Sequence, residues 1–309
     1  MPKRHREKSA QLTGDSDQQK AVQVPPIKKR KTCEDEENIQ KAEKKQTYSV
    51  EILCERGNIY NQDAYFVMPN MVGVLDGHGS LGHNLVTEIV SFFDQTKLQN
   101  TPAELMMDEL VSHLKEAKET KHLMTFNGST LVAIRQHPEH QDDPKHFQII
   151  QVGDSRCLRV FKNEKDEIDI EWLTIDHDLT SPEEHKRVID SENGTIIARR
   201  GRSKTLCYLG LKIDGEYSVN MSRAIGDEHL IPGGLLHTPS TYDFIQHEEK
   251  DICLILMSDG ISDVLTDDEI REQLQSSLTL PSIYEKVKEL TYERSGRLDD
   301  ATMVKLKWI

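Results

Sequence analysis

Aspartates recur in this sequence at points where an apolar run meets a turn. A single Asp-Gly pair is only a turn signal, but strand ends in a layered sheet structure converge on a common edge, so several such aspartates can surround one volume. Crowded carboxylates are tolerated when a cation holds them, and oxygen ligands favour Mg²⁺ or Mn²⁺. Five such motifs occur: Asn61-Gln62-Asp63, Asp76-Gly77-His78-Gly79, Gly153-Asp154-Ser155-Arg156, Ser258-Asp259-Gly260-Ile261-Ser262-Asp263 and Asp299-Asp300.

The elements that must position these residues are first of all short strands. Several of these runs are apolar throughout, which is typical of strands covered on both faces. The β-rich runs between turn residues are Tyr65–Val67, Met71–Leu75, Thr130–Arg135, Phe147–Val152, Arg156–Phe161, Ile168–Ile175, Ile252–Met257 and Thr302–Trp308.

Helical patterns lie between the strands. Apolar residues at three- and four-residue spacing predict a helical pair over Leu85–Leu98 and Ala103–Leu123. Capping boxes predict helix starts at Ser181 and Thr266, and a last helix over Ser282–Ser295 is expected to stop at Gly296. Because the helices fall in pairs rather than after every strand, the pattern predicts an α+β fold.

The order and spacing of eight motifs resemble one family, the metal-dependent Ser/Thr protein phosphatases of the PPM type, also called type 2C. The resemblance covers about residues 47–309 and implies a sandwich of two mainly antiparallel sheets flanked by pairs of helices. The motifs are Asn61–Ala64, Asp76–Gly79, Asn127–Thr130, Gly153–Arg156, Leu173–His177, Ser222–Asp227, Ser258–Gly260 and Asp299–Thr302.

The resemblance implies that the protein is an enzyme that hydrolyses phosphoserine and phosphothreonine in phosphoproteins with two Mg²⁺ or Mn²⁺ ions. Asp76 would bridge the ions, with the Gly77 carbonyl on one, Asp259 and Asp299 on the other, and Asp63 acting through a water. Two ions about 3.5–4 Å apart would activate a shared water as the nucleophile, and His78 would be the general acid. Asp154 and Asp263, with Asp259, match the residues that hold a weaker third ion in some members.

Two positions depart from the family pattern. Gln62 stands where the family often has glutamate, and Asn58 stands where it has an arginine that contacts the substrate phosphate. Gln62 can ligate through its amide oxygen or a water, but with one negative charge fewer the ion on the Gly77 side is expected to be the weaker one. Arg56 or Arg200 is a candidate to replace the missing arginine.

Two alternatives compete with this reading. Asp176-His177-Asp178-Leu179-Thr180 fits the nucleophile motif of haloacid-dehalogenase-type phosphatases, but that motif opens a parallel βαβ domain and here it lies past mid-chain. The second alternative is a pseudophosphatase that keeps the fold and binds phosphoproteins as a scaffold, and Gln62 and Asn58 motivate it. The retention of Asp76, Asp259 and Asp299 favours an enzyme.

Composition limits the remaining classes. The net charge is −14, and residues 1–46 carry 12 Lys and Arg against 8 Asp and Glu, so residues 47–309 carry −18. Such an acidic body is a poor nucleic-acid binder. There is no apolar run of about 18 residues and no apolar leader in the first twenty, so neither a membrane span nor a secretory signal is predicted. The expected location is the nucleus, the cytoplasm or both.

Residues 1–46 are polar and low in aromatic side chains, which predicts a disordered basic arm ahead of a phosphatase domain at 47–309. Within the arm, the cationic cluster Lys28–Lys31 after Pro25-Pro26 resembles a nuclear import signal and would contact an import receptor. The alternative is a solvated charged tail.

Overall fold

The structure is a computed structural model that describes residues 48–57, 59–96, 98, 100–116, 122–191, 193–200, 207–212, 218–294 and 297–308. The chain divides into two units, Met1–Lys44 and Lys45–Ile309, and all the described residues belong to the second. The expected basic arm and its Lys28–Lys31 cluster therefore lie outside the described residues. No helix in the described part of the chain is long and apolar enough to cross a membrane.

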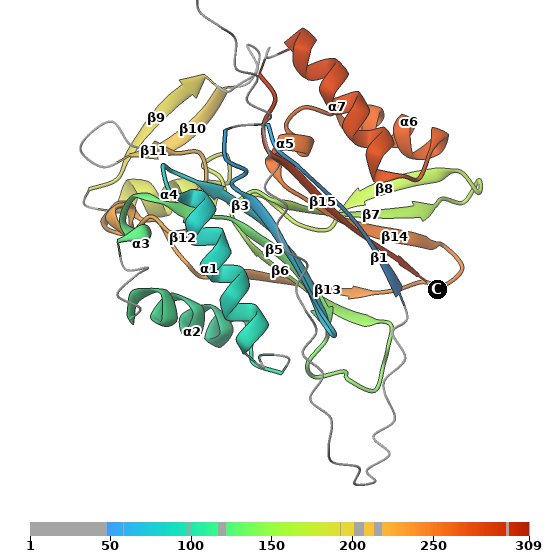
Figure 1. Ribbon diagram of the computed structural model, residues 1–309, viewed down its shortest axis with the longest axis horizontal. Coiled ribbons are helices and arrows are strands. Elements are labelled where there is room, and N and C mark those ends of the chain that lie inside the picture. The colour runs from blue at the N-terminus through green and yellow to red at the C-terminus, as the bar shows by residue number, and fades with distance from the viewer. Residues whose placement is uncertain are drawn as a thin grey trace, which may run out of the picture. The chain divides into compact units, whose positions relative to one another are not determined.

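Two antiparallel sheets form the centre of this unit (Figure 1). The first sheet has the order β1-β15-β14-β7-β8, and its strands are Tyr48–Glu55, Ala301–Trp308, Asp251–Met257, Arg156–Lys162 and Ile168–Trp172. The second has the order β12-β4-β3-β5-β6-β13, with β2 also paired to β3. Its strands β2 to β6, β12 and β13 are Asp63–Met68, Met71–His78, Gly128–Ser129, Leu131–Gln136, His146–Val152, Ile225–Gly226 and Ser240–Ile245.

The two sheets pack face to face through alternate residues of their strands. Val72 and Val74 of β3 lie in the same buried cluster as Leu254 of β14 and Val304 of β15. Leu75, which points to the opposite face of β3, belongs to a different cluster. This alternation is what a sheet buried on both faces requires, and it explains why β3 and β14 are apolar almost throughout.

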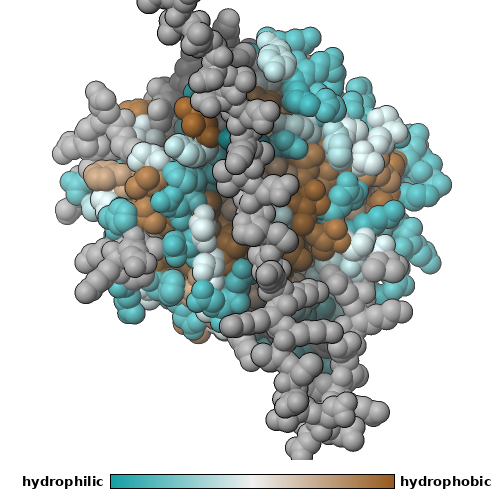
Figure 2. Space-filling view, viewed as in Figure 1, coloured by the Kyte–Doolittle hydropathy of each residue, from teal (hydrophilic) through white to brown (hydrophobic). Residues whose placement is uncertain are grey.

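Helices cover the outer face of each sheet (Figure 1). Helices α1 (Gly82–Gln95) and α2 (Ala103–Glu116) pack on the second sheet through buried residues such as Leu85 and Leu110. Helices α6 (Asp267–Ser276) and α7 (Leu280–Arg294) pack on the first sheet through residues such as Ile270 and Val287. The surface over α6 and α7 is mostly hydrophilic in Figure 2, as expected for helices that bury only one face.

The remaining elements lie near the edge of the sandwich where the motifs meet. They are α3 (Leu123–Phe126), α4 (Pro182–Asp190), α5 (Asp259–Ser262), the 3-10 helix η1 (Glu228–Gly233), and a three-stranded sheet β11-β10-β9 formed by Ser218–Val219, Cys207–Lys212 and Thr195–Arg200. The predicted α+β sandwich of two antiparallel sheets flanked by helices is confirmed.

The element boundaries correct several predictions. The strand predicted to reach Ile175 ends at Trp172, because the Thr174 hydroxyl accepts the Cys157 N–H at 3.0 Å and takes the place of a ladder carbonyl. The helix predicted over Leu85–Leu98 occupies Gly82–Gln95 instead. The one predicted over Ala103–Leu123 ends at Glu116, and α3 begins at Leu123.

The two capping boxes differ in outcome. Thr266 caps α6 as predicted, with its Oγ1 accepting the Glu269 N–H and its own N–H donating to the Glu269 carboxylate. Ser181 makes no side-chain cap on α4, because the Glu184 carboxylate that would complete the box accepts hydrogen bonds from Arg187 and Arg223. The predicted stop at Gly296 lies outside the described residues.

Candidate metal centre

A polar pocket of about 180 Å³ opens where the ends of both sheets meet. Strand β3 of the second sheet supplies Asp76, Gly77 and His78, while Asp259 follows β14 and Asp299 precedes β15 in the first sheet. Neighbouring antiparallel strands β14 and β15 place those last two aspartates side by side. The lining residues are Gln62, Asp76, Gly77, His78, Gly79, Ser218, Val219, Asn220, Met221, Asp259, Asp299 and Asp300.

Six of the predicted site residues therefore line one pocket: Gln62, Asp76, Gly77, His78, Asp259 and Asp299. Asp63 lies directly behind them, because it is the cross-strand partner of Asp76 in the β2–β3 pair. Asp154 and Asp263 do not line the pocket. The charges of Asp259 and Asp263 both act on the Asp154 carboxylate, so these three acids lie near one another.

Crowding changes the protonation of these acids. Burial, followed by the charges of Asp259 and Asp63 and a hydrogen bond with Asp259, raises the pKa of Asp76 well above its usual value. Burial and the charges of Asp259 and Asp300 raise the pKa of Asp63 to about 7, although Ser258 Oγ donates to its carboxylate at 2.7 Å. Such shifts mean that the ionised site lacks compensating positive charge.

Asp154 gives an independent indication that the site suits a cation. Its Oδ1 atom is buried and has no hydrogen-bond partner among the described residues. Burial and the charges of Asp259, Asp176 and Asp263 raise the pKa of Asp154 well above its usual value. Buried carboxylate oxygens without donors are costly, and a hard divalent cation satisfies them, so the donor set fits Mg²⁺ or Mn²⁺.

Gln62 is held in a fixed orientation at the pocket wall. Its amide nitrogen Nε2 donates to the Gly79 carbonyl at 2.6 Å, and its backbone carbonyl accepts the Gly77 N–H at 3.0 Å. A carboxylate at position 62 could not make the first of these bonds, because a carbonyl oxygen is only an acceptor. The substitution of glutamine for the family's glutamate is therefore matched to the local turn.

Asp300 holds the segment that carries Gln62. Its two carboxylate oxygens accept the backbone N–H groups of Gly57 at 2.8 Å and of Gln62 at 2.9 Å. Gly57 lies so close to the Asp299 backbone that a Cβ atom there would be 2.1 Å from the Asp299 carbonyl oxygen. The Asn61–Asp63 motif and the Asp299–Asp300 motif, far apart in the sequence, are thus one structural unit.

His78 is paired with a buried aspartate that sequence reasoning missed as a site residue. The His78 Nε2 atom lies 2.5 Å from Oδ2 of Asp227, which is fully buried and follows β12. Burial lowers the pKa of His78, but the charge and hydrogen bond of Asp227 outweigh it and raise the pKa above its usual value. Nδ1 of His78 is buried and has no hydrogen-bond partner among the described residues.

Gly128 makes that pair possible. It is the cross-strand partner of His78, and a Cβ atom at position 128 would lie 2.2 Å from Asp227 Oδ2 and 2.3 Å from His78 Nε2. Both Gly128 and Asp227 belong to motifs visible in the sequence, Asn127–Thr130 and Ser222–Asp227. The signal was present, but only the fold shows that the two motifs meet at His78.

Arg56, one of the two candidates to replace the missing arginine, does not lie at the pocket. Arg56 is exposed and donates through Nη1 to the Ile59 carbonyl at 3.2 Å, and it does not line the pocket. Asn58 and the side chain of Arg200 lie outside what the structure describes. Of the residues that the structure describes, no lysine or arginine lines the pocket wall.

The alternative nucleophile, Asp176, is engaged elsewhere. Both of its carboxylate oxygens accept hydrogen bonds from Arg156, at 2.8 Å and 3.0 Å from Nε and 2.5 Å from Nη2. Asp178, the second acid of that motif, accepts from the Thr180 N–H and hydroxyl. The antiparallel sheets and this ion pair exclude the haloacid-dehalogenase reading.

Comparisons with known proteins agree with this geometry. The sequence profile of the family "Protein phosphatase 2C" matches residues 70–294. Human protein phosphatase 1A is 29% identical over 187 residues, which cover 58% of this chain and 42% of the human protein, so the match spans less than half of that relative.

Two solved structures show the same fold. Serine-threonine phosphatase 2C from Toxoplasma gondii superposes with a TM-score of 0.64 at 15% identity, over 85% of this chain and 95% of that one. The catalytic domain of the serine threonine protein phosphatase PstP, in complex with 2 manganese ions, superposes with a TM-score of 0.51 at 17% identity, over 85% of this chain and 98% of that one. With a family profile that spans most of its length, the chain belongs to the protein phosphatase 2C family.

Proposed function

We propose that the protein is a Mg²⁺- or Mn²⁺-dependent protein Ser/Thr phosphatase. The observation that carries this proposal is the pocket in which Asp76, Asp259 and Asp299 converge from two sheets with no described lysine or arginine on its wall. A scaffold protein gains nothing from keeping so costly a cluster of buried acids. An enzyme that binds divalent cations needs it.

Each acid has a position that suits one role. Asp76 lies centrally and would contact both ions, with the Gly77 carbonyl on one side and Asp259 and Asp299 on the other. Asp63, one strand behind, would act through a water, and Asp154 with Asp263 would hold a weaker third ion. When bound, the ions supply an activated water and neutralise the phosphoryl oxygens.

His78 is the proposed general acid. Asp227 raises the pKa of His78, which favours the doubly protonated ring, and in that form Nε2, 2.5 Å from Asp227 Oδ2, donates to the carboxylate. The proton for the departing serine or threonine oxygen therefore comes from Nδ1, the nitrogen that Asp227 does not hold. Asp227 is a positioning residue in this scheme, because it orients the ring and sets its charge.

Gln62 and the absence of an arginine on the described pocket wall bear on substrate binding. The amide of Gln62 keeps its oxygen Oε1 for a metal-bound ligand while Nε2 is used on Gly79. With one negative charge fewer, the ion beside Gly77 is expected to bind more weakly than its neighbour. A phosphate held without a bidentate arginine also implies a high KM.

The experiment that tests the proposal compares point variants on a phosphothreonine peptide with and without millimolar Mn²⁺. Asp76→Asn and Asp259→Asn are expected to lower turnover by at least about a thousandfold, while Asp94→Asn, an exposed site on α1, leaves it unchanged. Turnover by the parent protein no higher than by Asp76→Asn would contradict the proposal and favour the pseudophosphatase, for which Gln62 is the specific motive.

The substrates are proposed to be phosphoproteins, and the location is proposed to include the nucleus through Lys28–Lys31. Replacing these four residues by alanine in a fluorescently tagged full-length protein tests the second point. A shift of the tag from nucleus to cytoplasm is expected. An unaltered distribution would show that the cluster is only a solvated tail.

A further inference from the structure

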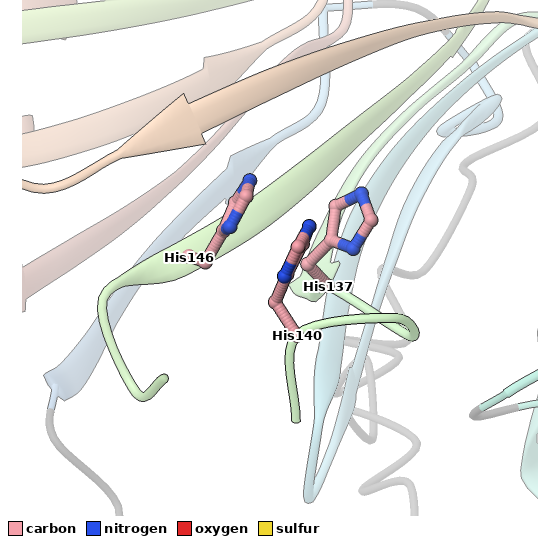
Figure 3. Close-up of side chains that lie close together, drawn as sticks. All are labelled: His137, His140 and His146. Carbon is pink, nitrogen blue, oxygen red and sulfur yellow. The ribbon is translucent and has the colours of Figure 1, made fainter. Parts of the chain in front are cut away.

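Three histidines meet at the connection between β5 and β6, at the end of the second sheet (Figure 3). His137 follows the last residue of β5, His140 lies in the turn, and His146 is the first residue of β6. One ring nitrogen from each lies within 4.8 Å of the others. We propose that His137, His140 and His146 form a binding site for a transition-metal ion of the Zn²⁺ type.

The site is separate from the candidate metal centre. Strand β6 runs from His146 to Val152, and Asp154 follows two residues later. At about 3.3 Å per residue, the six steps from His146 to Val152 span roughly 20 Å. The inference is therefore independent of the proposed phosphatase activity, and the two can fail separately.

The chemistry of the ligands selects the metal. Imidazole nitrogens suit Zn²⁺, Cu²⁺ and Ni²⁺, whereas Mg²⁺ and Mn²⁺ favour oxygen ligands. The histidine site is thus expected to prefer Zn²⁺-type ions, and the aspartate pocket is expected to prefer Mg²⁺ or Mn²⁺. Excess Mg²⁺ should occupy the pocket without competing at the histidines.

His146 lacks the partner that a buried nitrogen requires. Its Nε2 atom is buried and has no hydrogen-bond partner in the described part of the chain. The rings of His137 and His140 lie beside it, with centroids 4.6 Å and 4.1 Å from that of His146. A metal ion would satisfy that nitrogen.

His137 has the outer partner that metal-binding histidines usually have. Its Nε2 lies 3.2 Å from Oδ1 of Asp243 on β13, and its Nδ1 accepts the Glu139 N–H at 3.2 Å. The proton is therefore on Nε2, facing Asp243, and the lone pair is on Nδ1. A carboxylate behind a histidine fixes its tautomer and raises its basicity as a ligand. On binding, the metal replaces the Glu139 N–H at Nδ1.

His140 is the residue that must move. Nitrogens bound to one tetrahedral zinc are about 3.4 Å apart, given Zn–N bonds of about 2.0–2.1 Å, so the separations of up to 4.8 Å have to shorten. The His140 and His146 rings are stacked 4.1 Å apart at 10°, and two parallel rings cannot both point at the same ion. His140 is exposed on a turn, so its ring can tilt without disturbing the core.

A metal at this point would join three segments. Ligands come from the end of β5, the turn and the start of β6, and Asp243 brings in β13, which pairs with β6. The ion would therefore act as a cross-link at the end of the sheet opposite the aspartate pocket. A ligand that binds only the folded state raises the melting temperature. At a free metal concentration 100 times the Kd, the rise is on the order of 5 °C.

The test is a titration of the full-length protein with Zn²⁺ by calorimetry, in excess Mg²⁺, alongside Co²⁺ followed by visible absorption. One Zn²⁺ site and the intense absorption of tetrahedral Co²⁺ are expected. His140→Ala should weaken Zn²⁺ binding at least tenfold, and Asp243→Asn roughly tenfold. His113→Ala, an exposed histidine on α2, and Asp259→Asn, in the other site, should leave Zn²⁺ affinity unchanged.

Equal Zn²⁺ affinity and stoichiometry in the parent protein and His140→Ala would overturn the proposal, as would the weak Co²⁺ spectrum of an octahedral oxygen site. Because His140 is exposed, its removal does not create a core defect, and unchanged circular dichroism would verify the fold. Loss of phosphatase activity in Asp259→Asn with Zn²⁺ binding intact is the expected sign that the two sites are distinct.

Discussion

Asp227 is the residue that most sharpens the account of catalysis. It is fully buried beside a histidine, and its backbone has a φ of 49°, in the left-handed region that few residues other than glycine, asparagine and aspartate adopt. Its N–H donates to the Asn127 carbonyl at 2.9 Å, which fixes the turn. A strained position of this kind persists only where the surroundings enforce it, and here it serves His78.

Asp227→Asn preserves the shape and the turn while removing the charge. With a weaker hold on the His78 proton, hydrolysis of a phosphothreonine peptide should fall roughly 10- to 100-fold in kcat. Hydrolysis of p-nitrophenyl phosphate, whose leaving group departs without protonation, should fall much less. Steady-state kinetics on both substrates check this, and an equal loss on both would show that Asp227 is only structural.

The convergence of the candidate site residues on one pocket was largely predictable from the sequence, because each motif couples an aspartate to a strand end. Asp76, Asp259 and Asp299 could be placed at one edge before the fold was known. Asp227 and Asp300 could not, because their roles depend on contacts with His78 and Gln62 that lie 149 and 238 residues away along the chain. Long-range pairs of this kind leave no periodic pattern.

At the scale of elements, the two-residue strand β4 contributes to the site because Gly128 has no side chain. Gly128 of β4 leaves the space in which His78 of β3 meets Asp227 after β12. Gly128→Ala would place a Cβ atom within 2.3 Å of both partners and separate them. The expected result is a loss of turnover on the phosphothreonine peptide similar to that of Asp227→Asn.

A double variant makes this prediction specific. If Gly128→Ala acts by breaking the His78–Asp227 pair, the double variant Gly128→Ala with Asp227→Asn should be no slower than the more affected single variant. Additive losses in kcat would mean that Gly128→Ala damages the site by another route. Thermal melts of all three proteins control for unfolding.

Glu184, a buried acid on helix α4, links this helix to the Ser222–Asp227 segment through hydrogen bonds. Glu184 is 3% exposed and accepts hydrogen bonds from Arg187, Arg223 and the Ser222 hydroxyl. Burial opposes its ionisation, but these donors outweigh burial and lower the pKa of Glu184 to about 2. This contact is also the reason that the expected capping box at Ser181 is absent.

Glu184→Gln should therefore destabilise the protein, because it leaves two guanidinium groups short of their counter-charge. The expected loss in the free energy of unfolding is about 3 kcal/mol, measured by urea unfolding at pH 7. Glu183→Gln, at the exposed neighbouring position, is the matched control and should change it by less than about 0.5 kcal/mol. Equal stability of the two variants would contradict the inferred network.

The central strands and the edge strand β8 were predictable from the sequence, but several other peripheral strands were not. Strands β3, β5, β6 and β14 are buried on both faces, so their continuous apolar runs predict them. Strand β1 was missed because as an edge strand it buries few residues. Strands β9 to β11, which form a separate small sheet, were also missed, although β9 and β10 contain several apolar residues.

At the scale of the whole molecule, His177 forms hydrogen bonds with segments from different parts of the chain. Its Nδ1 accepts the Gly153 N–H at 3.1 Å, its Nε2 lies 2.8 Å from Ser240 Oγ, and its carbonyl accepts the N–H of Ser222. These bonds require a neutral ring, with the proton on Nε2. Burial, followed by the charge of Arg223, lowers the pKa of His177 to about 4.

This pKa predicts how the stability of the whole fold depends on pH. The unfolded chain takes up a proton on His177 near pH 6.5, whereas the folded protein does so only near pH 4, so stability is lost as pH falls from about 6.5 to 4. The slope from this group is at most about 1.4 kcal/mol per pH unit. Urea unfolding at pH 7.5 and pH 5 should show a larger loss in the parent protein than in His177→Gln. His113→Gln, at an exposed histidine on α2, should lose as much as the parent, and equal losses in all three proteins would show that His177 titrates normally in the folded state.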